Sequence, residues 1–291
     1  MVFLWVLLTF RNKQGENDPH NYTECQMKTS EFFAANPVFS LDKATTALAP
    51  NGGRPGTVER LKYHLRVGTL KLAARGVYAV VPAGMPADRF QPDPLLVASA
   101  VRSDGVFSHH SALELLGVAH SIWRQCTIYV KQRRRPLRLN DNTILFLEHP
   151  GALRLAASEQ LGTLRVERQG RLLHTTGPER TLVEGFRRPS LAGGLEELVR
   201  SASGFSTLDL DLLEKVLNGY GIANLWAAVG WFLERFQQDF YVPERMLERL
   251  AQQRPRSPHY LERDRRGGAL ATRWNLILPE SLTSMGGPDE R

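Results

Sequence analysis

The sequence predicts an α+β protein with two parts, an N-terminal winged helix-turn-helix and a mixed α/β region that ends in helices. Three short helical segments precede a β-hairpin over residues 28–82, and helical and strand patterns alternate over residues 88–253. The 291 residues fit about two domains at roughly 150 residues each. No apolar run approaches the ~20 residues that a membrane span needs, which excludes a multi-span membrane protein.

The N-terminal helices are predicted from their capping and breaking residues. Helices are expected over residues 29–33, 41–48 and 57–67. The first stops before Pro37, and Ser40 is a favoured N-cap for the second. Residues 51–56 predict a turn, because nothing in Asn-Gly-Gly-Arg-Pro-Gly favours a helix or a strand. Thr57 is then expected to cap the third helix, and Gly68 to end it.

A hairpin and a linker follow the third helix. Residues 70–72 and 77–81 are β-type runs, and the loop between them contains Gly76, so together they predict a hairpin. Three helices followed by a hairpin are the layout of a winged helix-turn-helix, which we expect over residues 28–82. The linker is expected at residues 83–87, in a stretch rich in proline and glycine.

A second domain is expected over residues 88–253, and a basic tail with a short strand over residues 254–291. Helices are expected at residues 94–102, 110–116, 181–186, 195–202, 208–217, 222–236 and 243–253. Strands are expected at residues 126–131, 143–148, 164–168 and, in the tail, 274–278. The aromatic residues of the helix at 222–236 are expected to form core, with a groove for a partner as the alternative.

Residues 1–27 are expected to lie outside the fold. The first ten resemble a short signal sequence but lack a positive segment before them and a cleavage site after them. Residues 11–26 are polar and without pattern. We therefore expect an upstream start codon, with the functional chain beginning at Met27; a disordered tail and a targeting segment are the alternatives.

The positive charge is concentrated near the N-terminus. The net charge is +7, and residues 28–82 alone carry eight basic side chains against three acidic ones, a net of +5. Thirty of the 37 basic residues are arginine, which a GC-rich genome would favour, but a uniform codon bias would not concentrate charge in one segment. A basic domain attracts phosphate, so a polyanion partner is expected.

The third helix has the pattern of a DNA-recognition helix. Val58, Leu61 and Leu65 share one face of a helical wheel, and the opposite face carries Glu59, Arg60 and Tyr63. The candidate DNA contacts are Arg54, Thr57, Arg60, Tyr63 and Arg66 on this helix and at its start, and Lys71 and Arg75 in the wing. Base reading is expected of Arg60 and Tyr63, and phosphate binding of Lys71 and Arg75. The alternative is an ordinary solvated face.

Three segments resemble a known family. Residues 68–78 resemble the "G-x-L-x-x-x-x-R-G-V-Y" hairpin of AbiEi-type antitoxins and their transcription-regulator relatives. Residues 108–117 resemble the family's "S-H-x-S-A-L-x-x-x-G" segment, and residues 174–184 its "T-x-x-R-T-L-x-D/E" segment. The three occur in the family's order within residues 28–200. Residues 1–27 lie outside the resemblance, and the loop at 50–54 departs from it.

The resemblance implies a bacterial, cytoplasmic antitoxin of a type IV toxin–antitoxin system that represses its own operon. Its winged helix would bind inverted repeats in double-stranded operator DNA. Its second domain would counteract a nucleotidyltransferase toxin encoded beside it. This function implies no enzymatic activity, catalytic residue, cofactor or metal. A nuclease or other DNA-modifying enzyme directed by the winged helix, and a stand-alone transcriptional regulator, are the alternatives.

Few residues of the second domain suggest chemistry. His109 and His110 would point about 100° apart on a helix, which favours packing and capping over a shared metal ion. Thr176 with Glu179 fits a capping box. Cys25 and Cys126 have no metal-ligand or disulfide-framework spacing, and a reduced cytosol is expected. Residues 131–135, with Arg138, are either a second phosphate contact or a solvated loop.

Overall fold

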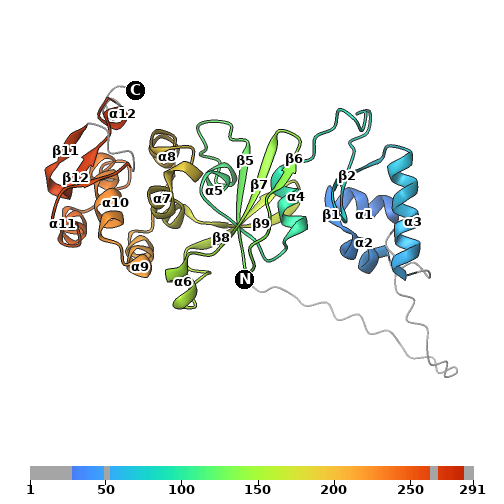
Figure 1. Cartoon of the computed structure of the whole chain (residues 1–291), viewed down its shortest axis with the longest axis horizontal. Coiled ribbons are helices and arrows are strands. Elements are labelled where there is room, and N and C mark those ends of the chain that lie inside the picture. Colours follow the sequence, from blue (N-terminus) through green and yellow to red (C-terminus); the bar gives the residue numbers. More distant parts are fainter. Residues whose placement is uncertain (1–27, 49–52, 263–267, 285–291) are drawn as a thin grey trace, which may run out of the picture.

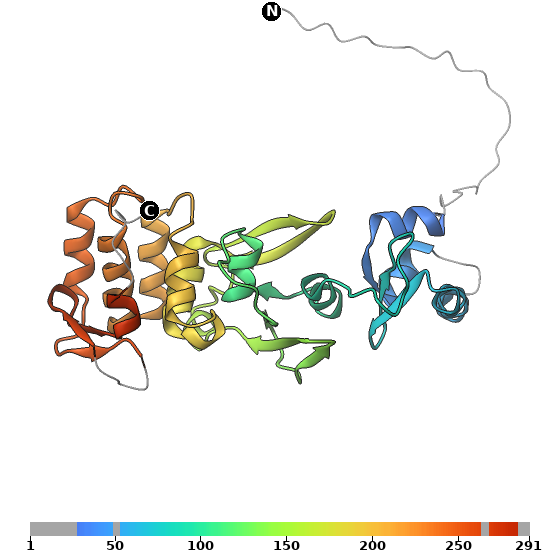
Figure 2. The same ribbon diagram turned by 90° about the horizontal axis from the view of Figure 1, so that it is seen from above.

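The computed structural model describes residues 28–48, 53–262 and 268–284. The expectation for residues 1–27 lies outside the described residues. The molecule is elongated and has three parts in a row, with the N-terminal helices at one end and the C-terminal helices at the other (Figures 1 and 2). All three parts contain both helices and strands, so the protein is mixed α and β. Among the described helices, none has the length and apolar character to cross a membrane.

The N-terminal part consists of three helices and a three-stranded antiparallel sheet. In chain order these are α1 (Thr29–Ala35), β1 (Val38–Ser40), α2 (Leu41–Leu48), α3 (Gly53–Arg66), β2 (Leu70–Ala74) and β3 (Val77–Val80). The strand order is β1-β3-β2. Phe32, Phe39, Leu61 and Leu70 form its buried core together with the half-buried or buried apolar residues around them. The amphipathic spacing of the helices thus places one face of each on the sheet or on a neighbouring helix.

Two details of this part differ from the prediction. Strand β1 was not predicted; its three residues pair with β3 through Val38, Phe39 and Ser40. Helix α3 begins at Gly53, four residues before the predicted cap at Thr57. Pro55 fits the first turn of a helix, where its missing N–H needs no partner. The turn predicted at residues 51–56 is therefore wrong from Gly53 onward, because the chain is already helical there.

The central part contains a six-stranded mixed sheet. Its elements are α4 (Pro94–Val101), β4 (Val106–Phe107), α5 (His110–Leu115), β5 (Gln125–Val130), β6 (Leu137–Leu139), β7 (Asn142–Glu148), α6 (Gly151–Leu155), β8 (Thr163–Arg168) and β9 (Arg171–Thr176). The strand order is β6-β7-β5-β4-β9-β8. The pairs β5–β7 and β4–β9 are parallel, and the other neighbours are antiparallel.

Helix α4 lies between the N-terminal sheet and the central sheet. Asp93 caps it by accepting a hydrogen bond of 2.8 Å from the Leu95 N–H. Leu95 and Leu96 share one apolar core with Val38, Val77 and Ala79 of the N-terminal sheet. The same core contains central-sheet residues such as Ile128. The segment predicted as the linker, residues 83–87, is thus followed after residues 88–93 by a helix that packs on both sheets.

The C-terminal part is a bundle of helices covered by a small sheet. Its elements are α7 (Pro178–Arg187), η1 (Pro189–Leu191), α8 (Leu195–Ala202), α9 (Leu210–Tyr220), α10 (Ala223–Arg235), α11 (Glu244–Gln252), β10 (His259–Tyr260), β11 (Ala269–Ala271), η2 (Thr272–Trp274), β12 (Leu276–Leu278) and α12 (Glu280–Thr283). The aromatic residues of α10 are buried in the bundle, as predicted for core: Trp226, Trp231, Phe232 and Phe236. Trp274 and Leu276, from the expected tail, lie in the same core.

Candidate nucleic-acid interface

Helix α3 presents a polar, cationic and aromatic face to solvent. Leu61 is fully buried against α1 and the sheet, and Leu65 packs beside it. On the other side Arg60, Tyr63 and Arg66 are exposed, and 58% of the Tyr63 surface is accessible. The spacing of three residues between each of these brings them onto one outer stripe of the helix. The predicted division of α3 into a buried and an exposed face is therefore confirmed.

The last turn of α3 is held in place around His64. The His64 ring lies edge-on to Phe33 at 4.9 Å and to Tyr63 at 5.3 Å between ring centroids. Its Nδ1 is 2.8 Å from the Thr69 hydroxyl oxygen. Burial, and secondarily the Arg60 guanidinium, lower the pKa of His64. A neutral His64 thus contacts both Phe33 and Tyr63 without adding to the positive charge at physiological pH.

Two residues at the start of α3 do not lie as the sequence suggested. Thr57 is fully buried, and its hydroxyl donates to the Gly53 carbonyl at 3.1 Å. It cannot offer its side chain to DNA, because it lies one turn inside the helix and not at its cap. Arg54 is exposed but forms an ion pair with Asp42 of α2. That pair reduces the positive charge available at the helix N-terminus.

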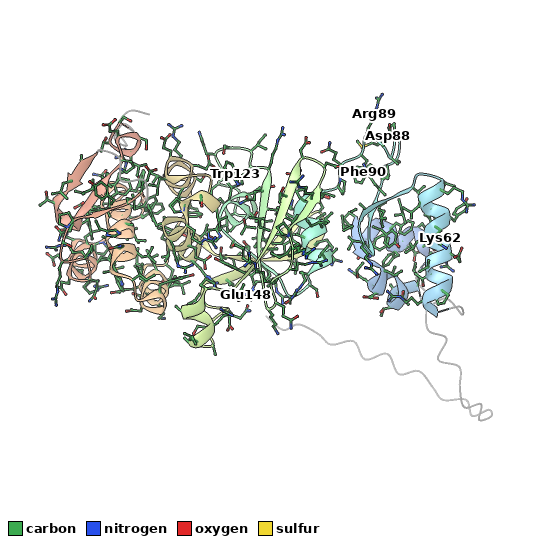
Figure 3. The ribbon with its side chains drawn as sticks, viewed as in Figure 1. Lys62, Asp88, Arg89, Phe90, Trp123 and Glu148 are labelled. Carbon is green, nitrogen blue, oxygen red and sulfur yellow. The ribbon has the colours of Figure 1, made fainter. Side chains whose placement is uncertain are left out.

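The hairpin places its two predicted phosphate contacts differently. Arg75 is exposed in the two-residue turn between β2 and β3. Lys71 instead points back toward the chain that leads to α4, where its Nζ donates to the Phe90 carbonyl at 2.5 Å and to the Asp88 carbonyl at 3.4 Å. Figure 3 labels Asp88, Arg89 and Phe90 in this segment, and Lys62 on the outer side of α3. The predicted phosphate contact of Lys71 would therefore require it to leave two carbonyl partners.

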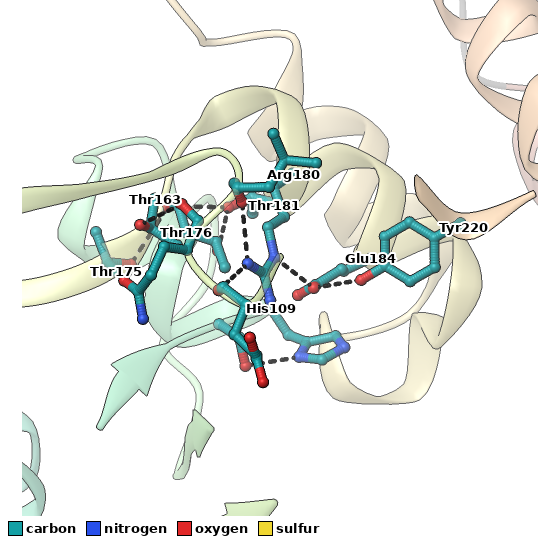
Figure 4. Close-up of polar contacts among 12 residues, drawn as sticks. His109, Thr163, Thr175, Thr176, Arg180, Thr181, Glu184 and Tyr220 are labelled. Atoms are coloured by element: carbon teal, nitrogen blue, oxygen red, sulfur yellow. Dashed lines mark hydrogen bonds and ion pairs between the residues drawn. The ribbon is translucent and has the colours of Figure 1, made fainter. Parts of the chain in front are cut away.

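A buried polar network lies where the central sheet meets the helical bundle (Figure 4). Arg180 of α7 is fully buried, and its Nε donates to Glu184 at 2.8 Å. Its Nη1 donates to the carbonyls of Glu159 and Leu161 at 2.7 and 3.0 Å. Tyr220 of α9 donates to the same Glu184 oxygen at 2.5 Å. The ion pair thereby joins α7, α9 and the segment before β8.

Several polar atoms of this network have no hydrogen-bond partner among the described residues. They are His109 Nε2, Tyr129 Oη, His149 Nδ1, Arg180 Nη2 and Glu184 Oε2. The Tyr129 ring lies 5.2 Å from the His149 ring, 5.8 Å from the His109 ring and 5.8 Å from the Arg180 guanidinium carbon. Burial lowers the pKa of His109 to about 4 and raises the pKa of Tyr129 well above its usual value. Both side chains are therefore neutral near pH 7.

The histidine pair and the predicted capping box of the second domain both lie at the starts of helices, α5 and α7. His109 and His110 are buried at the start of α5, and His109 has a positive φ of 53°. The capping box predicted for Thr176 and Glu179 is wrong, because the N-cap of α7 is Gly177, one residue later. Thr176 pairs instead with Thr181 at 2.7 Å between hydroxyl oxygens. Within the described residues, no group of three or more His, Cys, Asp or Glu side chains could hold a metal ion.

Comparison with known proteins shows the fold and no function. No family model matches the chain, and no curated protein matches it. The crystal structure of the RV2827C protein from Mycobacterium tuberculosis matches with a TM-score of 0.57 and 18% sequence identity. The match covers 86% of this chain and 90% of that one. The chain therefore shares an overall fold, over most of its length, with this mycobacterial protein.

Proposed function

We propose that residues 28–82 form a winged helix-turn-helix that binds double-stranded DNA. The order of three helices and three strands supports this, because α2 and α3 pack together and the β2–β3 hairpin follows α3 directly. In winged helices of this order, the second helix of the pair enters the major groove and the hairpin lies beside it. The net charge of +5 over these residues favours a phosphate-rich partner.

The observation that carries the proposal is the exposed stripe of Arg60, Tyr63 and Arg66 on α3. Arginine can bind a guanine edge with two parallel hydrogen bonds, and such contacts carry sequence information. Arg75 at the hairpin turn is placed to contact a phosphate, which would fix position without reading sequence. Buried Thr57, ion-paired Arg54 and carbonyl-bound Lys71 support the fold of the domain rather than the contact.

We further propose that the protein is an antitoxin that represses its own operon, acts in the cytoplasm and counteracts a nucleotidyltransferase toxin. The support is the resemblance of three segments to AbiEi-type antitoxins. One of these segments is the β2–β3 hairpin, and another contributes the buried Arg180–Glu184 pair. Since that pair holds helices together, the motif preserves a scaffold. This agrees with a protein that acts by binding and not by catalysis.

The DNA proposal is tested with the region directly upstream of the coding sequence and with a scrambled duplex of the same composition. Arg60→Ala should weaken binding to the upstream DNA by about 1–3 kcal/mol, measured by fluorescence anisotropy, and weaken the scrambled duplex less. Arg245→Ala, at an exposed position of α11, is the control and should change neither. Equal losses on both duplexes would show that Arg60 does not read bases.

The antitoxin proposal is tested by colony survival when the neighbouring open reading frame is induced. The full chain should protect cells, and an Arg60→Ala, Arg66→Ala variant should still protect them when expressed from a foreign promoter. Loss of protection at equal protein level would make antitoxicity depend on DNA binding. A neighbouring frame without toxicity would favour a stand-alone regulator. Cleavage of plasmid DNA by the purified protein with Mg²⁺ would favour the enzyme alternative.

A further inference from the structure

The loop between β5 and β6 carries the densest positive charge in the chain outside the N-terminal part. Within residues 131–138 there are five basic side chains and no acidic one: Lys131, Arg133, Arg134, Arg135 and Arg138. All five are exposed. The loop leads into β6, which contains Arg138 and is the edge strand of the central sheet. The cations therefore stand on the rim of a sheet and have solvent access.

The base of this loop is fixed by residues outside it. Arg102, just after α4, pairs with Asp104 at 2.6 Å and donates to the Gln132 carbonyl at 3.1 Å. Asp104 also accepts the backbone N–H of Lys131 at 3.3 Å. The Arg102 guanidinium lowers the pKa of Asp104 to about 2, so the pair is charged at every physiological pH. The loop is held without using any of its own cationic side chains.

The five cations have no ion-pair partner in the described part of the chain. Arg134 lies over the Phe146 ring at 5.2 Å, and the other four side chains form no hydrogen bond, ion pair or ring contact with the described residues. By contrast, Arg168 of β8 is neutralised by Asp93 and Glu114 at 2.6 and 2.9 Å. A fixed loop with unneutralised arginines concentrates positive potential at one place.

We propose that residues 131–138 bind the sugar–phosphate backbone of DNA as a second contact, separate from α3; this rests on the proposed DNA-binding function. Arginine binds phosphate with a planar pair of N–H donors, and four of the five cations are arginine. An acidic protein partner would need an exposed apolar anchor at the centre of the contact. Residues 131–138 offer none, since Leu137, at the start of β6, packs against the central core.

The test measures how binding to a fluorescein-labelled duplex of random sequence depends on NaCl concentration. Each phosphate contact contributes about 0.9 to the slope of log K against log salt. An Arg133→Gln, Arg134→Gln, Arg135→Gln, Arg138→Gln variant of the full chain should lower that slope by about 2–4. The matched control changes four exposed arginines of the C-terminal part to glutamine: Arg188, Arg200, Arg245 and Arg256. It removes the same charge and should change the slope by less than about 1.

The outcomes separate this proposal from the winged-helix one. If the loop variant behaves as the control does, residues 131–138 do not contact DNA, whatever α3 does. If the loop variant lowers the slope while Arg60→Ala, Arg66→Ala has no effect on DNA, the loop contact stands and the recognition-helix assignment fails. Labelled poly-L-glutamate is the second probe. Loss of affinity for it alone, with an unchanged slope on DNA, would show an acidic-protein contact and overturn the proposal.

Discussion

Arg180 of α7 is a charged side chain in the buried part of the molecule. Its side chain is fully buried, yet Nε and Nη1 together make three hydrogen bonds to Glu184 and to two carbonyls. Burial alone would lower the pKa of Arg180, but the adjacent Glu184 carboxylate outweighs it and the pKa is raised. Such a pair contributes little net stability compared with apolar residues, but removing one partner leaves a buried charge without compensation.

Glu184→Ala should therefore destabilise the protein by about 3–5 kcal/mol, because Arg180 stays buried and Tyr220 loses its acceptor. Urea denaturation followed by circular dichroism measures this. The control is Glu196→Ala, at an exposed position of α8, which should change the free energy of unfolding by less than about 0.5 kcal/mol.

A double variant separates charge burial from packing. Arg180→Met with Glu184→Leu removes both charges and should recover much of the loss seen in Glu184→Ala. If the double variant is as unstable as the single one, the hydrogen bonds to the carbonyls of Glu159 and Leu161 matter more than the ion pair.

His109 should make the stability depend on pH. Its pKa is about 4 in the folded protein and 6.5 without the fold, because burial disfavours the charged ring. As the pH falls below 6.5 the unfolded chain takes up a proton that the folded chain refuses, so stability falls until about pH 4. The full effect is about 3 kcal/mol. His109→Asn, which tolerates the positive φ, should lower the number of protons taken up on unfolding in this window by about one, as measured from the pH dependence of the free energy of unfolding in urea.

A pH dependence unchanged in His109→Asn would assign it to the other histidines. Burial also lowers the pKa of His110, His149 and His174, so these act in the same direction. At His110 the Glu197 carboxylate opposes the lowering of the pKa by burial.

At the scale of elements, the β2–β3 hairpin is tied to the following segment by Lys71. Lys71→Met should leave the salt slope of DNA binding unchanged, because its ammonium group serves the Phe90 carbonyl. Arg75→Met should lower that slope by about 0.9, since the side chain is exposed at the turn. Anisotropy titrations with the random-sequence duplex compare the two variants. A drop for Lys71→Met equal to that for Arg75→Met would show that Lys71 leaves its carbonyls when DNA binds.

Periodicity and capping residues predicted those elements whose signal is local. Leu61 and Tyr63 could be assigned to opposite faces of α3, because 100° per residue determines which side chains share a side. The partner of Lys71 could not be predicted, because the accepting carbonyl is 19 residues away and any residue type can supply one. Nor does Thr57 reveal its burial, since it resembles a cap equally well.

The short strands could not be predicted from the sequence. Strand β4 has two residues and β6 has three, too few for an alternating pattern to show. Strand β9 is longer but reads Arg-Leu-Leu-His-Thr-Thr, which mixes polar and apolar residues. It becomes a strand because it pairs with β8 on one side and with β4 on the other. Tertiary pairing therefore decides what local propensity leaves open.

At the scale of the whole molecule, the C-terminal segment completes the helical core. The Trp274 ring is fully buried over Gly230 of α10, and its Nε1 donates to Glu234 at 2.6 Å. A Cβ at position 230 would lie 2.0 Å from the Trp274 ring. The ring can only rest on α10 because that position lacks a side chain.

Gly230→Ala should expel Trp274 from its site and destabilise the protein by about 1–3 kcal/mol, despite the better helix propensity of alanine. Thermal denaturation measures the loss, and limited proteolysis should cut the displaced C-terminal segment sooner. Gly151→Ala is the control, because no atom lies within 4 Å of its added Cβ. Equal melting temperatures for Gly230→Ala and the original protein would mean that the C-terminal segment does not depend on this contact.

Helix α4 has consequences for how such a protein can be recombined. Leu95, Leu96, Val97 and Ala98 are all buried, so successive residues around the helix face either one sheet or the other. A chimera that exchanges the N-terminal part at residues 83–87 would set a foreign sheet against this α4 and its apolar partners. The crossover that respects both contacts lies after Arg102, so that α4 moves together with Val38, Val77 and Ala79 and only its central-sheet side must be matched. An N-terminal part that is exchanged between such proteins should therefore include this helix.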